Sequence, residues 1–268
     1  MEPVKVNWRY IVLAILIIYT MSPIVWLGIL SIKPEPAILG DPFAPFTPTS
    51  EHYLTLFDHF RFGPATGNSL IIAFIVLAIT VPISSMAAYG MSRFPFPGVQ
   101  WIMVFLLFCK IIVPAILVLP LWAIVDMLGL RGSIWGVVLG HLAWSLPFAI
   151  LILDSFFAEI PKTMEEAAWL DGCSRWKTLW KIVFPSIAPG IAIVCLFTFG
   201  TSWGEFLFAV TFTTVSMRTG PVQIALMTTD YKVWWGALAA SGIYWSIPII
   251  VIAILFNRHM TRGLRLSF

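Results

Sequence analysis

Two ionisable residues inside long apolar stretches are the side chains of this sequence best placed to do chemistry. Lys110 stands near the middle of the apolar run 101–125, and Glu205 lies within the run 187–212. A charge in such a run is costly unless it is paired or hydrated. The sequence therefore predicts a Lys110–Glu205 ion pair or a polar cavity shared by the two runs. A structural charge buried against a partner subunit is an equally open interpretation.

Aromatic and imidazole side chains in the same runs are candidates for contact with a polar solute such as a sugar. His141, Trp144 and Trp203 join Lys110 and Glu205 as the candidate residues of a substrate pathway. The chain has 13 tryptophans, and many lie close to the ends of apolar runs, where a membrane interface alone accounts for them. Packing is therefore the stronger alternative for any single tryptophan.

The sequence lacks the residue clusters that catalysis, metal binding or nucleotide binding requires. No Gly-rich loop followed by Lys-Ser or Lys-Thr is present, and no basic cluster with interleaved aromatic residues suggests a nucleic-acid partner. We expect no enzymatic activity, no metal and no cofactor on this chain. The residues that could have formed such clusters are dispersed: His52, His59, His141, His259, Cys109, Cys173 and Cys195.

The composition predicts an all-α integral membrane protein. Of 268 residues, 59% are hydrophobic and only 11% are charged, whereas soluble domains have about 45–50% and about 25%. About 20 apolar residues span a bilayer as a helix. Six continuous runs have that length, which argues against the short alternating segments of a barrel. The predicted transmembrane helices cover 10–30, 70–89, 101–125, 134–156, 187–212 and 237–256.

The distribution of Lys and Arg predicts that both termini are cytoplasmic. With the N-terminus inside, the inner segments hold twice as many basic residues as the outer ones, as the positive-inside rule requires. The first run is too long for a cleaved signal peptide, so we expect it to remain as a helix. The inner residues are Lys5, Arg9, Arg93, Lys162, Arg175, Lys177, Lys181, Arg258, Arg262 and Arg265; the outer ones are Lys33, Arg61, Arg131, Arg218 and Lys232.

Two connections between the predicted spans are long. The Pro-rich connection 33–68 is extracytoplasmic in this orientation, and the connection 158–185 between the fourth and fifth spans is cytoplasmic. No second domain is apparent, so residues 1–268 are expected to form a single transmembrane domain.

The cytoplasmic connection predicts a helix, a turn and a second helix at the inner membrane face. Residues 165–170 are mostly good helix formers with acids early, Pro161 precedes them, and Asp171-Gly172 is typical of a turn. Ala167 and Ala168 are expected to leave a small-residue face for another surface. Trp176, Leu179, Trp180 and Val183 then follow at helical spacing, with Lys177 and Lys181 between them.

This connection resembles the signature loop, the EAA motif, of ABC importer permeases. Six spans, a cytoplasmic C-terminus and a Gly263-Leu264 pair also look like the maltose-permease G-type subunit of the carbohydrate-uptake branch. Phe184 stands where that family usually has Leu. The residues that match the signature are Glu166, Ala167, Ala168, Gly172, Ile182 and Pro185, and with Asp171 they are the candidate ATPase-coupling residues.

The resemblance implies a subunit of an ATP-driven, binding-protein-dependent importer in the cell inner membrane, with a sugar or oligosaccharide as cargo. The loop would then be a coupling helix that docks on an ATP-binding subunit dimer, with ATP and Mg on those partners. A second permease subunit would complete a heterodimer, and an extracytoplasmic substrate-binding protein would deliver the cargo. Membrane lipid surrounds such a chain.

Other interpretations remain open. The same architecture can import glycerol phosphate esters, polyamines or peptides. A channel or carrier that works without an ATPase, or a membrane-embedded enzyme, would not require the signature loop. Substituting Gly172 or Glu166 separates these classes, because only an importer depends on that loop.

Overall fold

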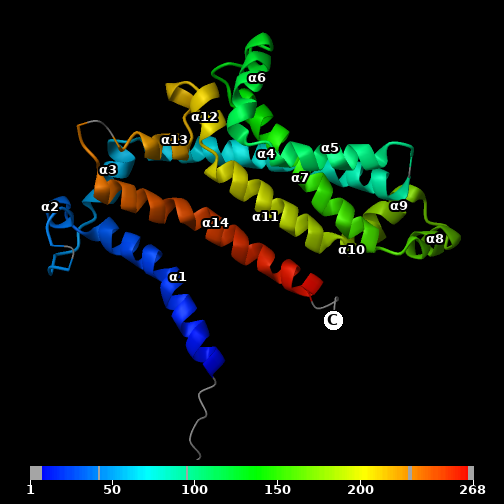
Figure 1. Cartoon of the computed structure of the whole chain (residues 1–268), viewed down its shortest axis with the longest axis horizontal. Helices are drawn as coiled ribbons and strands as arrows, with labels where there is room; N and C mark the ends of the chain where they lie inside the picture. The colour runs from blue at the N-terminus through cyan, green and yellow to red at the C-terminus, as the bar shows by residue number, and fades with distance from the viewer. Residues whose placement is uncertain (1–7, 42, 95, 229–230, 265–268) are drawn as a thin grey trace, which may run out of the picture. The chain divides into compact units, whose positions relative to one another are not determined.

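The computed structural model describes residues 8–41, 43–94, 96–228 and 231–264, and their regular structure is helical apart from one isolated bridge between Thr228 and Val233. The expectation of an all-α chain is confirmed (Figure 1). The elements are α1 Trp8–Ile32, α2 Glu35–Ile38, α3 Glu51–Asp58, α4 Phe62–Arg93, α5 Val99–Ile111, α6 Pro114–Met127, α7 Ile134–Glu159, α8 Lys162–Leu170, α9 Arg175–Thr178, the π-helix η1 Leu179–Val183, α10 Phe184–Ser186, α11 Ala188–Gly204, α12 Leu207–Phe212, the 3-10 turn η2 Val215–Met217, α13 Gly220–Ala225 and α14 Trp235–Leu264.

The helices form two compact units. The first comprises residues 1–64 and 223–248, and side chains of its Pro-rich connection hold it together. The Tyr53 hydroxyl donates to Ser31 Oγ at 3.0 Å, and His52 Nε2 donates to the Lys33 carbonyl at 2.7 Å. The Glu35 carboxylate accepts the backbone N–H groups that open α14. The connection is thus an ordered, partly helical segment.

The second unit, residues 65–222 and 249–268, is built around α7. Helices α5, α6, α11 and α12 all pack against α7. One core cluster joins Val137 and Val138 of α7 to Phe208 and Phe212 of α12. Gly140 lets α12 approach, because a Cβ atom there would come within 2.9 Å of the Phe208 ring. Small residues on α7 therefore set the spacing of this bundle.

Four helices of the described residues, α1, α4, α7 and α14, are long and apolar enough to cross a membrane, and up to six spans result if each of two bent helix pairs counts as one. The predicted first, second, fourth and sixth spans are confirmed as single helices. Helix α4 begins at Phe62, ahead of the predicted start. Of the residues used to orient the chain, Lys5 and Arg265 lie outside the described residues, as do the side chains of Arg258 and Arg262.

The predicted third span, 101–125, consists of two helices instead of one. Helices α5 and α6 meet at a bend of 103° (Figure 1). Ile112 and Val113 adopt extended backbone angles immediately before Pro114. A residue before proline is pushed out of the helical region, and proline offers no N–H to continue the ladder. Pro114 therefore ends α5 and opens α6.

The predicted fifth span is also interrupted. Helix α11 ends at Gly204, Glu205 is extended, and a separate helix α12 begins at Leu207. Before α11, the segment Arg175–Ser186 is bent by 71° from it. The hydrophobicity of 187–212 thus identified an apolar segment correctly, but it did not predict the break at Glu205.

Candidate functional site

Helix α8 confirms the helix predicted in the connection between the fourth and fifth spans. It begins after Pro161, whose extended ψ angle of 131° places it just outside the helix, and runs to Leu170. Glu165 in the first turn suits the positive end of the helix dipole. The helix follows α7 after only Ile160 and Pro161.

Gly172 ends α8 by the mechanism the sequence indicated. Its φ angle is +79°, a left-handed conformation that side chains with a Cβ rarely adopt. The Gly172 N–H donates to the Trp169 carbonyl at 3.0 Å, and the Cys173 N–H donates to the Ala168 carbonyl at 2.9 Å. This pair of bonds is a Schellman motif. It reverses the chain tightly and leaves Asp171 and Gly172 exposed at the tip.

The two alanines of the signature do not form one face. Ala168 is buried within the chain, whereas Ala167 is exposed together with Glu166 and Leu170. Successive helical residues are separated by about 100°, so adjacent alanines diverge. The free face of α8 thus carries one small residue, one acid and a leucine that is 89% exposed.

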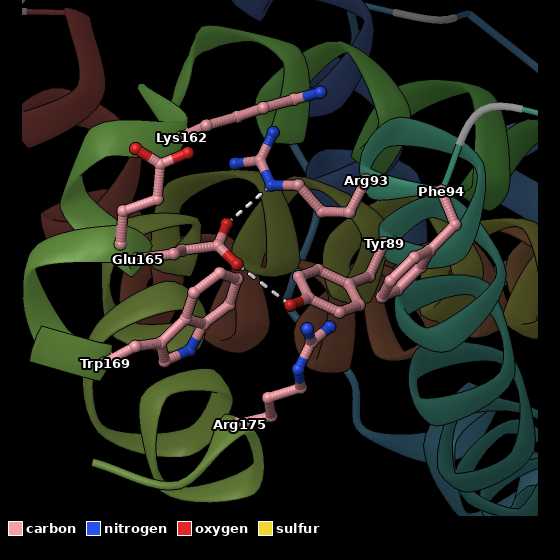
Figure 2. Close-up of a pocket in the computed structure, with 8 residues that line it drawn as sticks. Tyr89, Arg93, Phe94, Lys162, Glu165, Trp169 and Arg175 are labelled. Atoms are coloured by element: carbon pink, nitrogen blue, oxygen red, sulfur yellow. Dashed lines mark hydrogen bonds and ion pairs between the residues drawn. The ribbon is translucent and has the colours of Figure 1, made fainter. Parts of the chain in front are cut away.

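Glu165 holds the inner face of α8 to the end of α4. Its carboxylate accepts a hydrogen bond from Arg93 Nε at 2.5 Å and another from the Tyr89 hydroxyl at 2.9 Å. Arg93 Nη2 also donates to the Ile160 carbonyl at 3.0 Å. Figure 2 shows the carboxylate between these two donors. We call Glu165, Arg93 and Tyr89 the α8 clasp.

The clasp is buried: the Arg93 and Glu165 side chains keep only 7% and 3% of their surface. A buried pair of this kind is costly to break, because removing one partner leaves the other charge without compensation. Sequence reasoning missed it and singled out Glu166. The available signal was Arg93 at the end of an apolar run, facing a connection with two adjacent acids.

A pocket of about 230 Å³ lies beside the clasp (Figure 2). The Arg175 side chain borders it and also stacks over the Trp169 ring, 4.8 Å from its centroid. This contact connects α9 to α8 across the turn. The lining residues are Tyr89, Arg93, Phe94, Lys162, Glu165, Glu166, Trp169 and Arg175.

The segment after the turn does not present its four apolar residues on one face as predicted. Leu179 and Val183 are buried in the core of the second unit, whereas Trp176 and Trp180 are exposed. The four positions cover an arc of the helix that is wide enough to face both the core and the surface. The π-helical turn 179–183 widens this arc further. Of the remaining signature residues, Ile182 is half-buried and Pro185 is exposed at the start of α10.

Lys110 occupies an aromatic cage rather than an ion pair. Its ammonium lies 4.1 Å from the Trp144 ring centroid, 4.6 Å from that of Phe148 and 4.8 Å from that of Phe197. Three helices, α5, α7 and α11, supply the cage. The predicted Lys110–Glu205 pair is wrong within the described part of the chain, because Glu205 has other partners. Aromatic faces attract a cation through their quadrupole and partly replace its hydration.

Glu205 holds the break between α11 and α12. Its carboxylate accepts the backbone N–H groups of Phe208 and Ala209 at 2.8 and 3.1 Å. His141 Nε2 lies 3.1 Å from the same carboxylate, and His141 Nδ1 lies 2.8 Å from Ser202 Oγ. A carboxylate only accepts hydrogen bonds, so Nε2 carries the hydrogen, and in the neutral ring Nδ1 accepts from Ser202.

The candidate pathway residues therefore separate into two groups. Trp144 belongs to the Lys110 cage, while His141 belongs to the Glu205 junction. Trp203 has no exposed surface and stacks on Phe199, with ring centroids 5.6 Å apart. In this structure Trp203 packs within the chain, as the alternative interpretation of single tryptophans expected.

Several apolar helices, with a helix–turn–helix held between two of them, are the architecture expected of a membrane permease of the ABC importer type. Residues 80–266 match the family described as the binding-protein-dependent transport system inner membrane component. The chain belongs to this family. It is a multi-pass inner-membrane permease subunit, not an enzyme.

Similar proteins cover almost the whole chain. The trehalose/maltose transport system permease protein MalG of Thermococcus litoralis is 35% identical over 251 residues, covering 92% of this chain and 90% of that protein. The trehalose transport system permease protein SugB of Mycobacterium tuberculosis is 33% identical, covering 92% and 91%.

Solved structures share the fold. A chain of a bacterial ABC transporter involved in the import of the acidic polysaccharide alginate superposes with a TM-score of 0.77 at 18% identity, covering 93% of this chain and 94% of that one. A chain of a bacterial alginate ABC transporter in complex with an alginate pentasaccharide-bound periplasmic protein gives a TM-score of 0.69 at 17% identity, covering 98% and 97%.

Proposed function

We propose that this chain forms half of a heterodimeric permease that imports a sugar or oligosaccharide, with ATP hydrolysed on Mg by a partner ATPase dimer. The trehalose and maltose permeases at 33–35% identity support a saccharide cargo. The solved alginate transporter with a bound periplasmic protein supports delivery by a substrate-binding protein. The whole of 1–268 acts as one transmembrane domain, with both termini in the cytoplasm and α8 on the cytoplasmic side.

The α8 clasp is the observation that carries the coupling role. It fixes α8 to the end of α4, a 32-residue apolar helix. A force on the exposed face of α8 is therefore transmitted to a membrane span instead of being lost in a flexible loop. Glu166, Ala167 and Leu170 form the exposed contact surface, and Asp171 and Gly172 its tip. Ala168 is buried behind this surface, and Ile182 and Pro185 follow it in the second part of the loop.

The substrate pathway is proposed to involve the Lys110 cage. The cage combines three aromatic faces with one ammonium donor, groups that match the ring faces and hydroxyls of a saccharide. His141, Trp203 and Glu205 position the helices around it. The charge of Lys110 stays available for hydrogen bonding because an aromatic face, unlike a carboxylate, accepts none of its protons strongly.

A substitution on the free face of α8 tests the coupling role. We expect Leu170→Glu to prevent co-purification of ATPase subunits and to abolish sugar-stimulated ATP hydrolysis, with thermal unfolding unchanged. Leu39→Glu is the matched control, because Leu39 is also an exposed leucine, on the segment after α2. A chain that purifies without any ATPase before substitution, yet still moves sugars in vesicles, would show a channel or carrier instead.

A further inference from the structure

The segment Arg175–Ser186, made of α9, η1 and α10, carries a continuous row of three aromatic rings, two of them exposed. Trp176 is 61% exposed and Trp180 is 53% exposed. Their ring centroids lie 5.9 Å apart, and those of Trp180 and Phe184 lie 4.7 Å apart. Lys177 and Lys181 are exposed beside this row, one position further along the helix. We call Trp176, Trp180, Phe184, Lys177 and Lys181 the aromatic–lysine row.

The opposite face of the segment is already occupied. Thr178, Leu179, Val183 and Ile187 are buried, and the last three belong to a core cluster with Leu153 and other residues of the second unit. The segment is therefore fixed in rotation about its own axis. The Trp176 and Trp180 rings point outward because the buried face is held by packing, whereas the Phe184 ring is half-buried and also packs against that core cluster.

The segment also lies across the direction of the span that follows it. Its axis is bent by 71° from α11, which runs on as an apolar helix. Spans are tilted by about 20° from the bilayer normal on average, so a helix that meets one at such an angle lies nearer to the plane of the bilayer surface than to its normal. Tryptophan is enriched at that level, where its ring is partly apolar and its N–H can meet polar headgroups. Lysine side chains reach from there to the phosphates.

The charge of the segment specifies which headgroups it suits. Arg175, Lys177 and Lys181 are its charged residues, and no acid occurs between Asp171 and the end of α11 at Gly204. A positive row of this kind is attracted to anionic lipids and gains little from zwitterionic ones. We propose that the aromatic–lysine row is a docking surface for anionic phospholipid headgroups of the adjacent leaflet. This inference requires only that the chain spans a membrane, so it is independent of the cargo.

Lipid contact predicts a role distinct from that of α8. Trp176 and Trp180 would sit at the boundary of headgroups and acyl chains, with Lys177 and Lys181 on the phosphates. The row would then hold the far end of the helix–turn–helix at the membrane surface, while the α8 clasp holds the near end to α4. The loop is thereby supported at both ends, with its tip left free.

Brominated lipids test the proposal directly, because bromine quenches tryptophan fluorescence only at short range. The full chain, with its co-purifying subunits, is placed in nanodiscs containing brominated phosphatidylglycerol or brominated phosphatidylcholine at equal mole fraction. The fluorescence of the row is obtained by subtracting the fluorescence of the Trp176→Phe/Trp180→Phe variant from that of the unmodified chain. We expect this difference signal to be quenched more strongly by the anionic lipid.

Lysine variants separate headgroup binding from mere proximity. Lys177→Gln/Lys181→Gln should remove the preference for phosphatidylglycerol, with each lysine contributing about fivefold to it. Lys162→Gln, an exposed lysine on α8, should leave the preference unchanged. Equal quenching by both lipids in the unmodified chain would overturn the proposal.

Two further outcomes would assign the row to a protein instead. If neither lipid quenches the difference signal, another subunit covers the rings. If Lys177→Gln/Lys181→Gln releases the ATPase subunits in both lipids, the row belongs to the coupling surface. Both outcomes refute lipid docking, and the first leaves the proposed importer function intact, because Leu170→Glu tests that separately.

Discussion

Two glutamates, Glu165 in the loop between the fourth and fifth spans and Glu205 at the break in the fifth, show two ways of using a carboxylate that is largely shielded from solvent. Glu165 bonds to side chains of a helix more than 70 residues earlier in the sequence, through Arg93 and Tyr89. Glu205 bonds mostly to the chain immediately after it, through the N–H groups of Phe208 and Ala209, with His141 as its one distant partner.

The difference separates a connection between two helices from a junction that shapes one apolar segment. The α8 clasp joins α8 to α4, two elements that lie far apart in the sequence. The Glu205 junction stabilises a break in an apolar segment by supplying acceptors to freed backbone donors. Lys110, the cation between these sites, uses aromatic rings instead of either carboxylate.

Breaking the clasp should have the largest effect. Glu165→Gln leaves Arg93 charged and buried without an anion, and loss of one partner of a buried pair costs about 3–5 kcal/mol. We expect a marked fall in the thermal unfolding temperature of the purified chain and a loss of sugar-stimulated ATP hydrolysis. Glu166→Gln is the control, since Glu166 is exposed on the same helix.

The thermal measurement is the decisive one for the clasp. Glu166→Gln should leave the unfolding temperature unchanged even if it weakens ATPase docking. Equal unfolding temperatures for Glu165→Gln and the unmodified chain would show that Arg93 and Tyr89 find other partners, and the clasp would lose its structural role.

Removing the junction carboxylate should have a smaller effect. Glu205→Ala deprives the first turn of α12 of its acceptor, which costs about 1–2 kcal/mol by analogy with lost helix caps. His141 also loses a partner. Chemical denaturation in detergent should show the loss, and Glu159→Ala, at an exposed position at the end of α7, should not. A larger loss than for Glu165→Gln would reverse the order argued above.

Changing the turn should cost less again. Gly172→Ala must adopt a φ of +79°, which is unfavourable by about 1 kcal/mol for a residue with a Cβ. No atom lies within 4 Å of the added methyl group, so strain and not a clash is the cause. We expect a small fall in stability together with weaker ATPase coupling. Gly67→Ala, within α4 and also in open space, is the matched control and should be neutral or stabilising.

Lys110 should show the smallest change in stability and a clear change in transport. Lys110→Met loses a cation–π contribution of about 0.5–2 kcal/mol but also removes a charge from an apolar setting, so the two terms largely offset. Sugar uptake should fall in Lys110→Met and be better preserved in Lys110→Arg, which keeps the cation over the rings. Unmodified rates in Lys110→Met would exclude Lys110 from the pathway.

The helices with continuous apolar sequence were predictable, and the interrupted ones were not. Hydrophobicity averaged over about 20 residues identifies α1, α4, α7 and α14, because burial in a bilayer demands little else of a side chain. The same average stays high over the segments that contain Pro114 and Glu205, so it does not reveal that the helices end there. Proline signals a break in the sequence, but whether a membrane helix kinks or ends there depends on the neighbours that satisfy the freed backbone groups.

The loop was predicted in outline and not in orientation. Gly172 as a turn residue and the helix before it follow from local chemistry, since a left-handed residue and helix-forming side chains act within a few positions. Which of two adjacent acids turns inward depends on Arg93 and Tyr89, which lie on another helix. The same holds for the two alanines, and for Trp176 and Trp180 against Leu179 and Val183.

What the sequence determined by itself was therefore the class of molecule: a helical membrane chain with a helix–turn–helix between its fourth and fifth apolar runs. Its composition and short-range signals suffice for that, because bilayer burial and turn geometry are local constraints. Only the tertiary structure decided the partners of Glu165, Glu205 and Lys110. Each charge had several candidates of suitable chemistry along the chain, and the packing of the helices brought one set within bonding distance.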